Sequence, residues 1–260
     1  MSGLSRRSPL AYFALTIALS VPFWVAGALT ETELLPAIPT SALMVVAPAA
    51  AASLLVYREA RVPAVVALWK RAFDLHRVRR KVWYLPTIAW MPAVMALSWV
   101  ALRVGGVEIP LPQLSPWTTA LLFITFFAAA VGEELGWSAY VIDPLEDRLG
   151  ALGGALALGA FCVAWHVIPL LQAQRSVGFI AWWSVGTVAS RVLIAWLYGN
   201  TGRSVFVVIL FHTMLNLAWA CFPIEGSYYD PRVTSAITAA SAFIVVAAGG
   251  LRRRAERRTA

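Results

Sequence analysis

The feature that most constrains this chain is a series of apolar runs, each about as long as a membrane is thick. A helix needs about 20 apolar residues to cross the roughly 30 Å hydrocarbon core of a bilayer. Eight segments reach that length: 10–30, 34–57, 83–104, 116–142, 153–171, 177–198, 204–222 and 233–251. They are too long for transmembrane β-strands and lack the alternation of a barrel. The sequence therefore predicts an all-α polytopic protein, a bundle of about eight transmembrane helices in the cell membrane.

The composition agrees with a membrane protein. Of the 260 residues, 60% are hydrophobic and 13% are charged, which lies outside the range of ordinary soluble domains. Pro36, Pro39 and Pro48 interrupt the second segment, which is the least regular of the eight. No internal repeat or low-complexity linker divides the chain, so we expect a single membrane-embedded domain over residues 1–260.

The distribution of charge predicts the topology. The formal net charge is +8. When the chain is drawn back and forth across the membrane, 17 of the 21 Lys and Arg fall in termini and connections on the same side. Such a bias marks the cytoplasmic side, so both termini are expected in the cytoplasm. The basic charge thus predicts contact with anionic membrane lipids and no nucleic-acid partner. The preference for Arg over Lys, with abundant Ala, is typical of GC-rich bacterial genomes.

Two connections carry a local signal. In residues 62–75, "VPAVVALWKRAFDL", most apolar side chains fall on one side of a helix, which fits either an amphipathic helix in the membrane interface or an ordinary solvated connector. In residues 143–154, Pro144 and the glycines predict a short turn of helix between spans four and five. Cys162 and Cys221 both lie in predicted spans, so no disulfide framework is expected.

Six polar side chains lie inside the apolar segments, where an ionised group costs about 2.5–3.5 kcal/mol on insertion scales. They are Glu133 and Glu134 in 116–142, His166 in 153–171, Arg191 in 177–198, and His212 and Asn216 in 204–222. At 1.5 Å per residue, Glu133, Arg191 and His212 lie about 15, 11 and 13 Å from the cytoplasmic ends of their spans, and His166 lies roughly 20 Å deep. These depths allow the side chains to meet.

Helix geometry separates the two adjacent glutamates, because residues three or four apart share a face. Glu133 shares a stripe with Trp137 and Tyr140. Glu134 is turned by about 100° and shares a stripe with Ser138. One acid is therefore expected to face a cavity and the other to brace the bundle.

The polar set predicts hydrolytic chemistry. His212 and Asn216 share a face, being four residues apart. Glu133 would take a proton from water, a histidine would hold or shuttle it, and the Asn216 amide would donate to a developing oxyanion. Glu133, His166 and His212 would equally suit a divalent metal such as zinc. A third interpretation is structural, since buried His and Asn also join helices by hydrogen bonds.

Three stretches, "EELGWSAY", "FCVAWHVIP" and "FHTMLN", follow one another on successive hydrophobic segments. In this order they resemble the motifs of the CPBP family of intramembrane endopeptidases, also called the ABI family, which comprises CAAX prenyl proteases and bacteriocin-processing enzymes. The resemblance covers residues 117–223, so the helices of 116–222 are expected to carry catalysis. It implies peptide-bond hydrolysis within or near the membrane, at a site open toward the cytoplasm.

The resemblance also implies a role for each residue. Glu133 would be the water-activating base and His166 its partner, while His212 and Asn216 complete the water and oxyanion site. Glu134 would be the second acid. The family chemistry has been described both as glutamate-dependent and as metal-dependent, and the sequence leaves both open. The implied substrate is a membrane-associated peptide or protein, prenylated or not, that reaches the site near the cytoplasmic face.

Two positions depart from the family motifs. The family has Arg four residues after the second Glu, where this chain has Ser138, and Phe four residues before the first His, where it has Cys162. A hydroxyl can hydrogen-bond a carboxylate but cannot neutralise it. We therefore predict that Arg191 supplies the missing cation to Glu134, because each would otherwise be an unpaired buried charge. The alternative is that Arg191 extends to the lipid interface.

Two other classes of function fit part of these features. A catalytically silent scaffold or immunity protein would keep the fold, and Ser138 in the place of the motif arginine favours it. A proton-coupled transporter would also place Glu, His and Arg in spans, but it would be expected to show inverted repeats with broken helices, which the sequence lacks. The combined features favour an intramembrane peptidase.

Overall fold

The computed structural model describes residues 7–30, 33–35, 38–112 and 115–251. The longer elements are α1 (Pro9–Leu29), α2 (Ala47–Lys70), α3 (Tyr84–Val104), α4 (Pro116–Gly136), α5 (Ile142–Gln172), α6 (Val177–Asn200), α7 (Val205–Ala220) and α8 (Pro231–Ala247). The short 3₁₀ segments are η2 (Thr40–Val46), η3 (Arg71–Phe73), η4 (Leu75–Arg77) and η5 (Lys81–Trp83), and η6 (Trp137–Val141) is π-helical. Two short strands, β1 (Glu33–Leu35) and β2 (Ile38–Pro39), pair antiparallel. The predicted all-α architecture is confirmed.

The chain is a multi-pass membrane protein. Within the described residues, five helical stretches are long and apolar enough to cross a membrane: Pro9–Leu29, Thr40–Phe73, Lys81–Val104, Pro116–Gln172 and Val177–Asn200. The fourth stretch contains both α4 and α5 and is long enough for two crossings. The apolar helices α7 and α8 have 16 and 17 residues.

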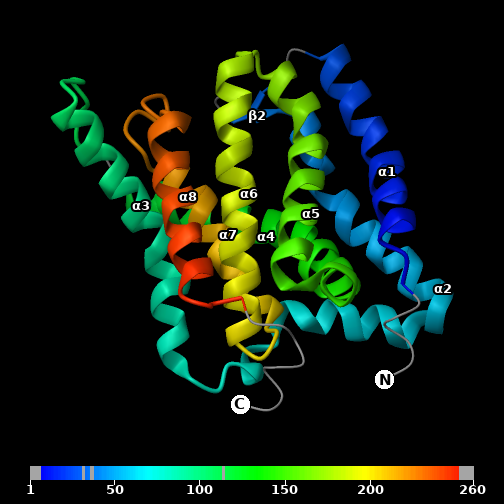
Figure 1. Cartoon of the computed structure of the whole chain (residues 1–260). Helices are drawn as coiled ribbons and strands as arrows, with labels where there is room; N and C mark the ends of the chain where they lie inside the picture. The colour runs from blue at the N-terminus through cyan, green and yellow to red at the C-terminus, as the bar shows by residue number, and fades with distance from the viewer. Residues whose placement is uncertain (1–6, 31–32, 36–37, 113–114, 252–260) are drawn as a thin grey trace.

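Figure 1 places the start of α1 and the end of α8 toward the same, lower side of the bundle. The assignment of that side to the cytoplasm stays a prediction. Of the arginines that support it, Arg6 and those after residue 251 lie outside the described residues.

The second predicted span is wrong in its boundaries. The expected helix 34–57 gives way at its start to strand and 3₁₀ structure, and the helix runs from Ala47 to Lys70 instead. Prolines explain the shift, because proline lacks an N–H and is tolerated mainly before a helix or in its first turn. Pro39 directly precedes η2, and Pro48 lies in the first turn of α2. Pro36 lies outside the described residues.

Serine caps begin four of the helices. The hydroxyls of Ser8, Ser115, Ser176 and Ser204 each accept from a backbone N–H three residues later, at the starts of α1, α4, α6 and α7. Such a cap satisfies one of the N–H groups that a helix start leaves free. A serine directly before the apolar run therefore marks where each of these four helices begins.

The polar connection after the second span is helical. The helix α2 bends at Arg61, whose φ of 58° is not helical, and its last part runs across the lower end of the bundle in Figure 1. Leu68 and Ala72 are buried against the protein, whereas Val66 and Trp69 are exposed. Apolar side chains therefore lie on both the buried and the exposed side of this segment, and its placement as an amphipathic helix in the membrane interface stays a prediction.

The predicted turn between spans four and five is also present. The chain continues from α4 through η6 into the first part of α5, which is interrupted at Gly150 with a φ of 74°. Such left-handed backbone favours glycine, which has no Cβ. The interruption allows the rest of α5 to run beside α6.

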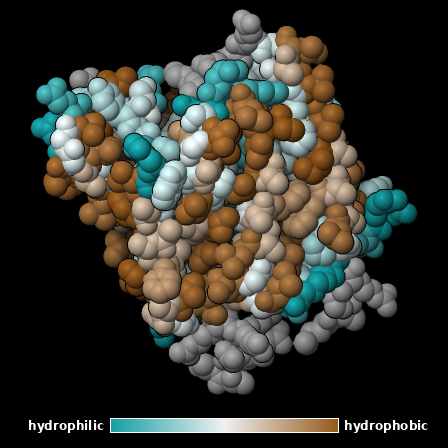
Figure 2. All heavy atoms as spheres, turned by 45° about the horizontal axis from the view of Figure 1, so that its top comes forward, coloured by the Kyte–Doolittle hydropathy of each residue, from teal (hydrophilic) through white to brown (hydrophobic). Residues whose placement is uncertain are grey.

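The helix α4 lies against α7 on one side and α2 on another, while α6 packs against α5, α7 and α8. The largest fully buried side chains include Trp137, Trp165, Tyr198 and Phe211. Figure 2 shows mostly apolar side chains on the visible face, with hydrophilic groups toward the edges. Large apolar side chains such as Trp117 and Phe243 are exposed, as expected of a surface that faces lipid. Among the described residues, the buried Asp, Glu and Arg side chains lie on α4 and α6 or at the end of the bundle that holds Asp74, Asp143 and Glu146.

Candidate active site

The two glutamates lie where α4 changes its winding. The α-helix ends at Gly136, and the next five residues form the π-helix η6. Single π turns inside helices are rare and are frequent at functional sites. Glu133 and Glu134 are both buried. Their position just before the wider turn directs them into the interior of the bundle.

Glycines on either side of the pair allow α4 to approach its neighbours closely. A Cβ added to Gly132 would lie 2.5 Å from the carbonyl oxygen of Val45, and one added to Gly136 would lie 2.7 Å from that of Pro48 and would overlap the Tyr12 hydroxyl. No side chain fits at such distances. Close packing on this face brings the two acids toward the centre of the protein.

We expect Gly136→Ala to destabilise the fold by about 1–3 kcal/mol, because overpacking forces the surrounding backbone to move. The measurement is the free energy of unfolding in mixed micelles. Gly178→Ala is the matched control: a Cβ there has no neighbour within 4 Å, so the stability should stay equal or rise slightly. Equal stability of the two variants would contradict the close packing.

Glu134 is the centre of a buried polar cluster. Its Oε1 accepts from Arg191 Nη1 at 2.7 Å and lies 2.9 Å from His212 Nδ1, and its Oε2 accepts from Ser138 Oγ at 2.5 Å. All four residues are buried. The predicted pairing of Arg191 with Glu134 is thus observed, and Arg191 does not extend to the lipid. A cation from α6 and a serine hydroxyl together take the place of the motif arginine.

The contact with Glu134 fixes the orientation of His212. A carboxylate paired with arginine only accepts hydrogen bonds, so His212 Nδ1 carries the proton and donates. Its Nε2 is then left for other partners. The sequence predicted His212 beside Glu133, whereas its direct partner is Glu134.

Glu133 has a separate environment. Its Oε2 accepts from the indole Nε1 of Trp137 at 3.1 Å, as the shared stripe predicted. Tyr140, predicted on the same stripe, instead donates to Glu59 at 3.4 Å and lies under the Arg7 guanidinium. One indole occupies only part of the capacity of a carboxylate, which has about four acceptor positions. Glu133 is therefore the acid with room for a further donor.

His166 lies between two tryptophans. Its Nδ1 lies 2.8 Å from the carbonyl oxygen of Cys162, and its ring is 4.7 Å from Trp165 and 5.2 Å from Trp183. A carbonyl only accepts, so Nδ1 donates and Nε2 is left with a lone pair. Within the described chain His166 makes no direct hydrogen bond to Glu133.

Asn216 lies one turn beyond His212 on α7 and is partly buried. Its side chain has no hydrogen-bond partner among the residues that the structure describes. Both the Asn216 amide and the Nε2 atoms of the two histidines are thus left without a direct partner in the described fold. These groups are the ones a reacting substrate could engage.

A metal site does not fit this arrangement. Over the described residues, no group of three or more His, Cys, Asp or Glu side chains is placed so that it could hold a metal ion. Glu133, His166 and His212, the suggested ligands, do not form such a group. The geometry supports no step that depends on a metal.

A small cavity of about 10 Å³ lies beside the cluster, lined by Ser138, Arg191 and Tyr198 with four apolar side chains. That volume is about the smallest that holds one water molecule. Arg191 has five N–H donors and gives one to Glu134, so it has donors left for a water. The short Ser138 side chain leaves this space open.

Several features of the site had no signal in the sequence. The π turn has no composition of its own, and the carbonyl partner of His166 is a backbone atom. A further buried network, in which Asp74 contacts the start of α7, was not predicted either. For this network alone the sequence held a weak signal: Asp74 is the single acid in an otherwise basic connection, "KRAFDLHRVRRK".

Comparison with known proteins gives two matches. Residues 115–218 match the family model described as Rce1-like, type II CAAX prenyl endopeptidase. Over 232 residues the chain is 25% identical to a protein of Methanococcus maripaludis named CAAX prenyl protease 2, an alignment that covers 82% of this chain and 84% of that protein. The matched family region contains Glu133, His166, Arg191 and His212.

Proposed function

Since the chain belongs to the CPBP family of CAAX-type intramembrane endopeptidases and is thus a peptidase, we propose that Glu133 is the base that activates the attacking water. One observation carries this proposal: the two adjacent acids have different partners. Glu134 is occupied by a cation, an imidazole and a hydroxyl, whereas Glu133 accepts one indole N–H. Of about four acceptor positions on each carboxylate, three are filled on Glu134 and one on Glu133, so Glu133 has the greater free capacity for a water.

The proposed reaction uses one water molecule. Glu133 accepts a proton from the water as its oxygen bonds to the peptide carbonyl carbon, and the carbonyl oxygen becomes an oxyanion. The Asn216 amide donates to that oxygen, which stabilises the developing charge. The bond from carbon to nitrogen then breaks, and the proton passes from Glu133 to the leaving amine.

The two histidines support this reaction in different ways. His166 presents Nε2 to the water because its Nδ1 is bonded to a backbone carbonyl. His212 is held by Glu134 and is placed one turn from Asn216, and its imidazolium form, which carries a proton on Nε2 as well, donates to the oxyanion. The assembly of Glu134, Arg191 and Ser138 acts on the reaction through the position of His212.

The proposed substrate is a peptide or a membrane-associated protein that reaches the site from the basic side of the bundle. The Methanococcus relative is named a CAAX prenyl protease, and a prenylated peptide is one candidate substrate for this chain. The silent-scaffold alternative rested on the missing motif arginine, and Arg191 now supplies that charge. No observation favours the transporter.

The test is cleavage of a peptide library by the purified chain in liposomes. Half of the peptides carry a prenyl thioether near the C-terminus, and products are identified by mass spectrometry. We expect cleavage of a subset of peptides at a rate that a chelator changes less than about twofold, because no metal step is needed. A folded protein that cleaves no peptide would contradict the proposal, and complete loss of activity with the chelator would contradict a reaction without a metal.

A further inference from the structure

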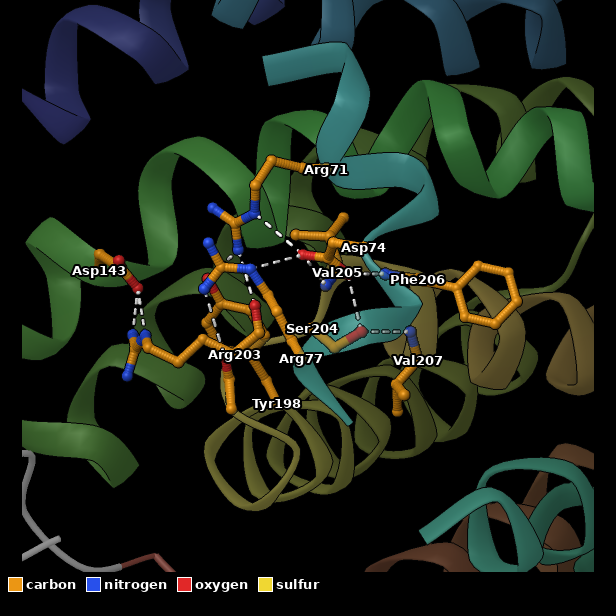
Figure 3. A network of polar contacts seen from close by, with 11 residues as sticks. Arg71, Asp74, Arg77, Asp143, Tyr198, Arg203, Ser204, Val205, Phe206 and Val207 are labelled. Atoms are coloured by element: carbon orange, nitrogen blue, oxygen red, sulfur yellow. Dashed lines mark hydrogen bonds and ion pairs between the residues drawn. The ribbon is translucent and has the colours of Figure 1, made fainter. Parts of the chain in front are cut away.

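A second buried polar network lies at the end of the bundle, about 10 Å along α7 from His212. Figure 3 shows Asp74, from the connection between α2 and α3, beside the first residues of α7. Asp74 and Ser204 are separated by 130 residues in the chain, and both are buried. A charge buried at this point requires partners, and it has five.

Three of the partners belong to the start of α7. Asp74 Oδ1 accepts from Ser204 Oγ at 2.8 Å and from the backbone N–H of Phe206 at 3.1 Å, and Oδ2 accepts from the N–H of Val205 at 3.3 Å. Ser204 Oγ itself accepts from the N–H of Val207. The N–H groups that a helix start leaves free are therefore satisfied by two side chains, one of them from a distant connection. A carboxylate also suits the positive end of the helix dipole.

The remaining partners connect Asp74 to the neighbouring helices. Arg71 and Arg77 lie 3.1 and 3.3 Å from its Oδ2. Arg71 Nη2 also donates to the Tyr198 hydroxyl at 3.1 Å and to the carbonyl of Arg203 at 2.7 Å. One guanidinium thus joins Asp74 to the end of α6 and to the turn before α7.

The turn between α6 and α7 is held in an unusual backbone conformation. Gly202 and Arg203 have φ values of 66° and 60°, and such a conformation is unfavourable for an arginine. The Arg203 side chain pairs with Asp143 and with Glu146, at 2.9 Å, at the start of α5. The network therefore joins the ends of α5, α6 and α7, the three helices that carry His166, Arg191 and His212.

From these contacts we propose that Asp74 is a positioning residue of the active site: it fixes the axial position of α7 and so the contact of His212 with Glu134. The proposal rests on the proposed function for its catalytic consequence. The helix α7 is hydrogen-bonded along its length, so displacement at its start is carried to His212 two turns later. A hydrogen bond of 2.9 Å is lost when its atoms move apart by about 1 Å.

The first test compares kinetic constants in liposomes. Asp74→Asn keeps the shape and loses the charge, and we expect kcat to fall about 10- to 100-fold with KM changed less than about twofold. Asp230→Asn is the matched control, because Asp230 caps α8, which carries no site residue. In an Asp74→Ala background, Ser204→Asp gives α7 its own acidic cap and should restore most of the rate. An unchanged kcat in Asp74→Asn would overturn the proposal.

The second test does not depend on activity. The chain has three histidines, so the full protein labelled with ¹⁵N-histidine in liposomes gives few ring signals, which His76→Gln and His166→Gln assign. We expect the Nδ1 signal of His212 to move in Asp74→Asn and to stay in place in Asp230→Asn. An unmoved signal would refute the positioning role even where Asp74→Asn cleaves more slowly than the wild type. A moved signal in a protein that cleaves nothing would support the positioning role and count against the peptidase mechanism alone.

Discussion

Arg191→Ala is expected to destabilise the protein by about 3–5 kcal/mol, because it leaves the carboxylate of Glu134 buried without its cation. The pair is separated by 2.7 Å, and both side chains are almost fully buried. The hydroxyl of Ser138 and the imidazole of His212 remain, but neither replaces a permanent charge. The free energy of unfolding in mixed micelles measures the effect.

A double-mutant cycle shows whether that loss belongs to the pair. In a Glu134→Gln background, no carboxylate is left unpaired, so Arg191→Ala should cost less by about 1–3 kcal/mol. Arg232→Ala is the control, since Arg232 pairs with Asp230 at the exposed start of α8 and its loss should change stability little. If Arg191→Ala lowered the free energy of unfolding equally in both backgrounds, the ion pair would contribute nothing to stability.

Glu133→Gln is expected to lower kcat by about 10²- to 10⁴-fold, the contribution of a positioned general base. The amide keeps an oxygen for the Trp137 indole, so the folded structure should be retained, with a stability within about 1 kcal/mol of the wild type. Cleavage is followed with the best peptide from the library, and stability is measured in parallel.

The control for this variant is Glu108→Gln, the same change at an exposed glutamate between α3 and α4. It should leave both rate and stability unchanged. A Glu133→Gln protein that cleaves at the wild-type rate would remove the base from the mechanism. A variant that unfolds would show that Glu133, like Glu134, is needed for the folded structure.

The positions of the helices could be predicted because a bilayer imposes one length on each crossing. The sharpest local prediction, the divergence of Glu133 and Glu134, followed from the rotation of about 100° per residue in a helix. Trp137 and Ser138 contact the acids that this rotation assigns to them. The pairing of Arg191 with Glu134 was predicted from their similar depth, the missing motif arginine and the cost of leaving either charge buried without a partner.

The remaining features depend on information that helix geometry does not contain. Depth places His212 at the level of both acids, but the rotation of α7 about its own axis selects Glu134. That rotation is set by packing, and the proposed axial position of α7 depends on the contact of Asp74, which lies 130 residues from Ser204. The start of α2 was mistaken because prolines at the edge of an apolar run shift a helix without changing its hydropathy.

The most direct test of the central claim, that Glu133 activates the water that cleaves the peptide bond, is cleavage in water enriched with ¹⁸O. Wild-type protein and Glu133→Gln are incubated in the same liposomes with the same peptide, and the products are weighed by mass spectrometry. We predict that the wild type places ¹⁸O in the new carboxyl terminus of its product and that Glu133→Gln forms almost no product in the same time. Equal amounts of labelled product from both proteins would contradict the claim.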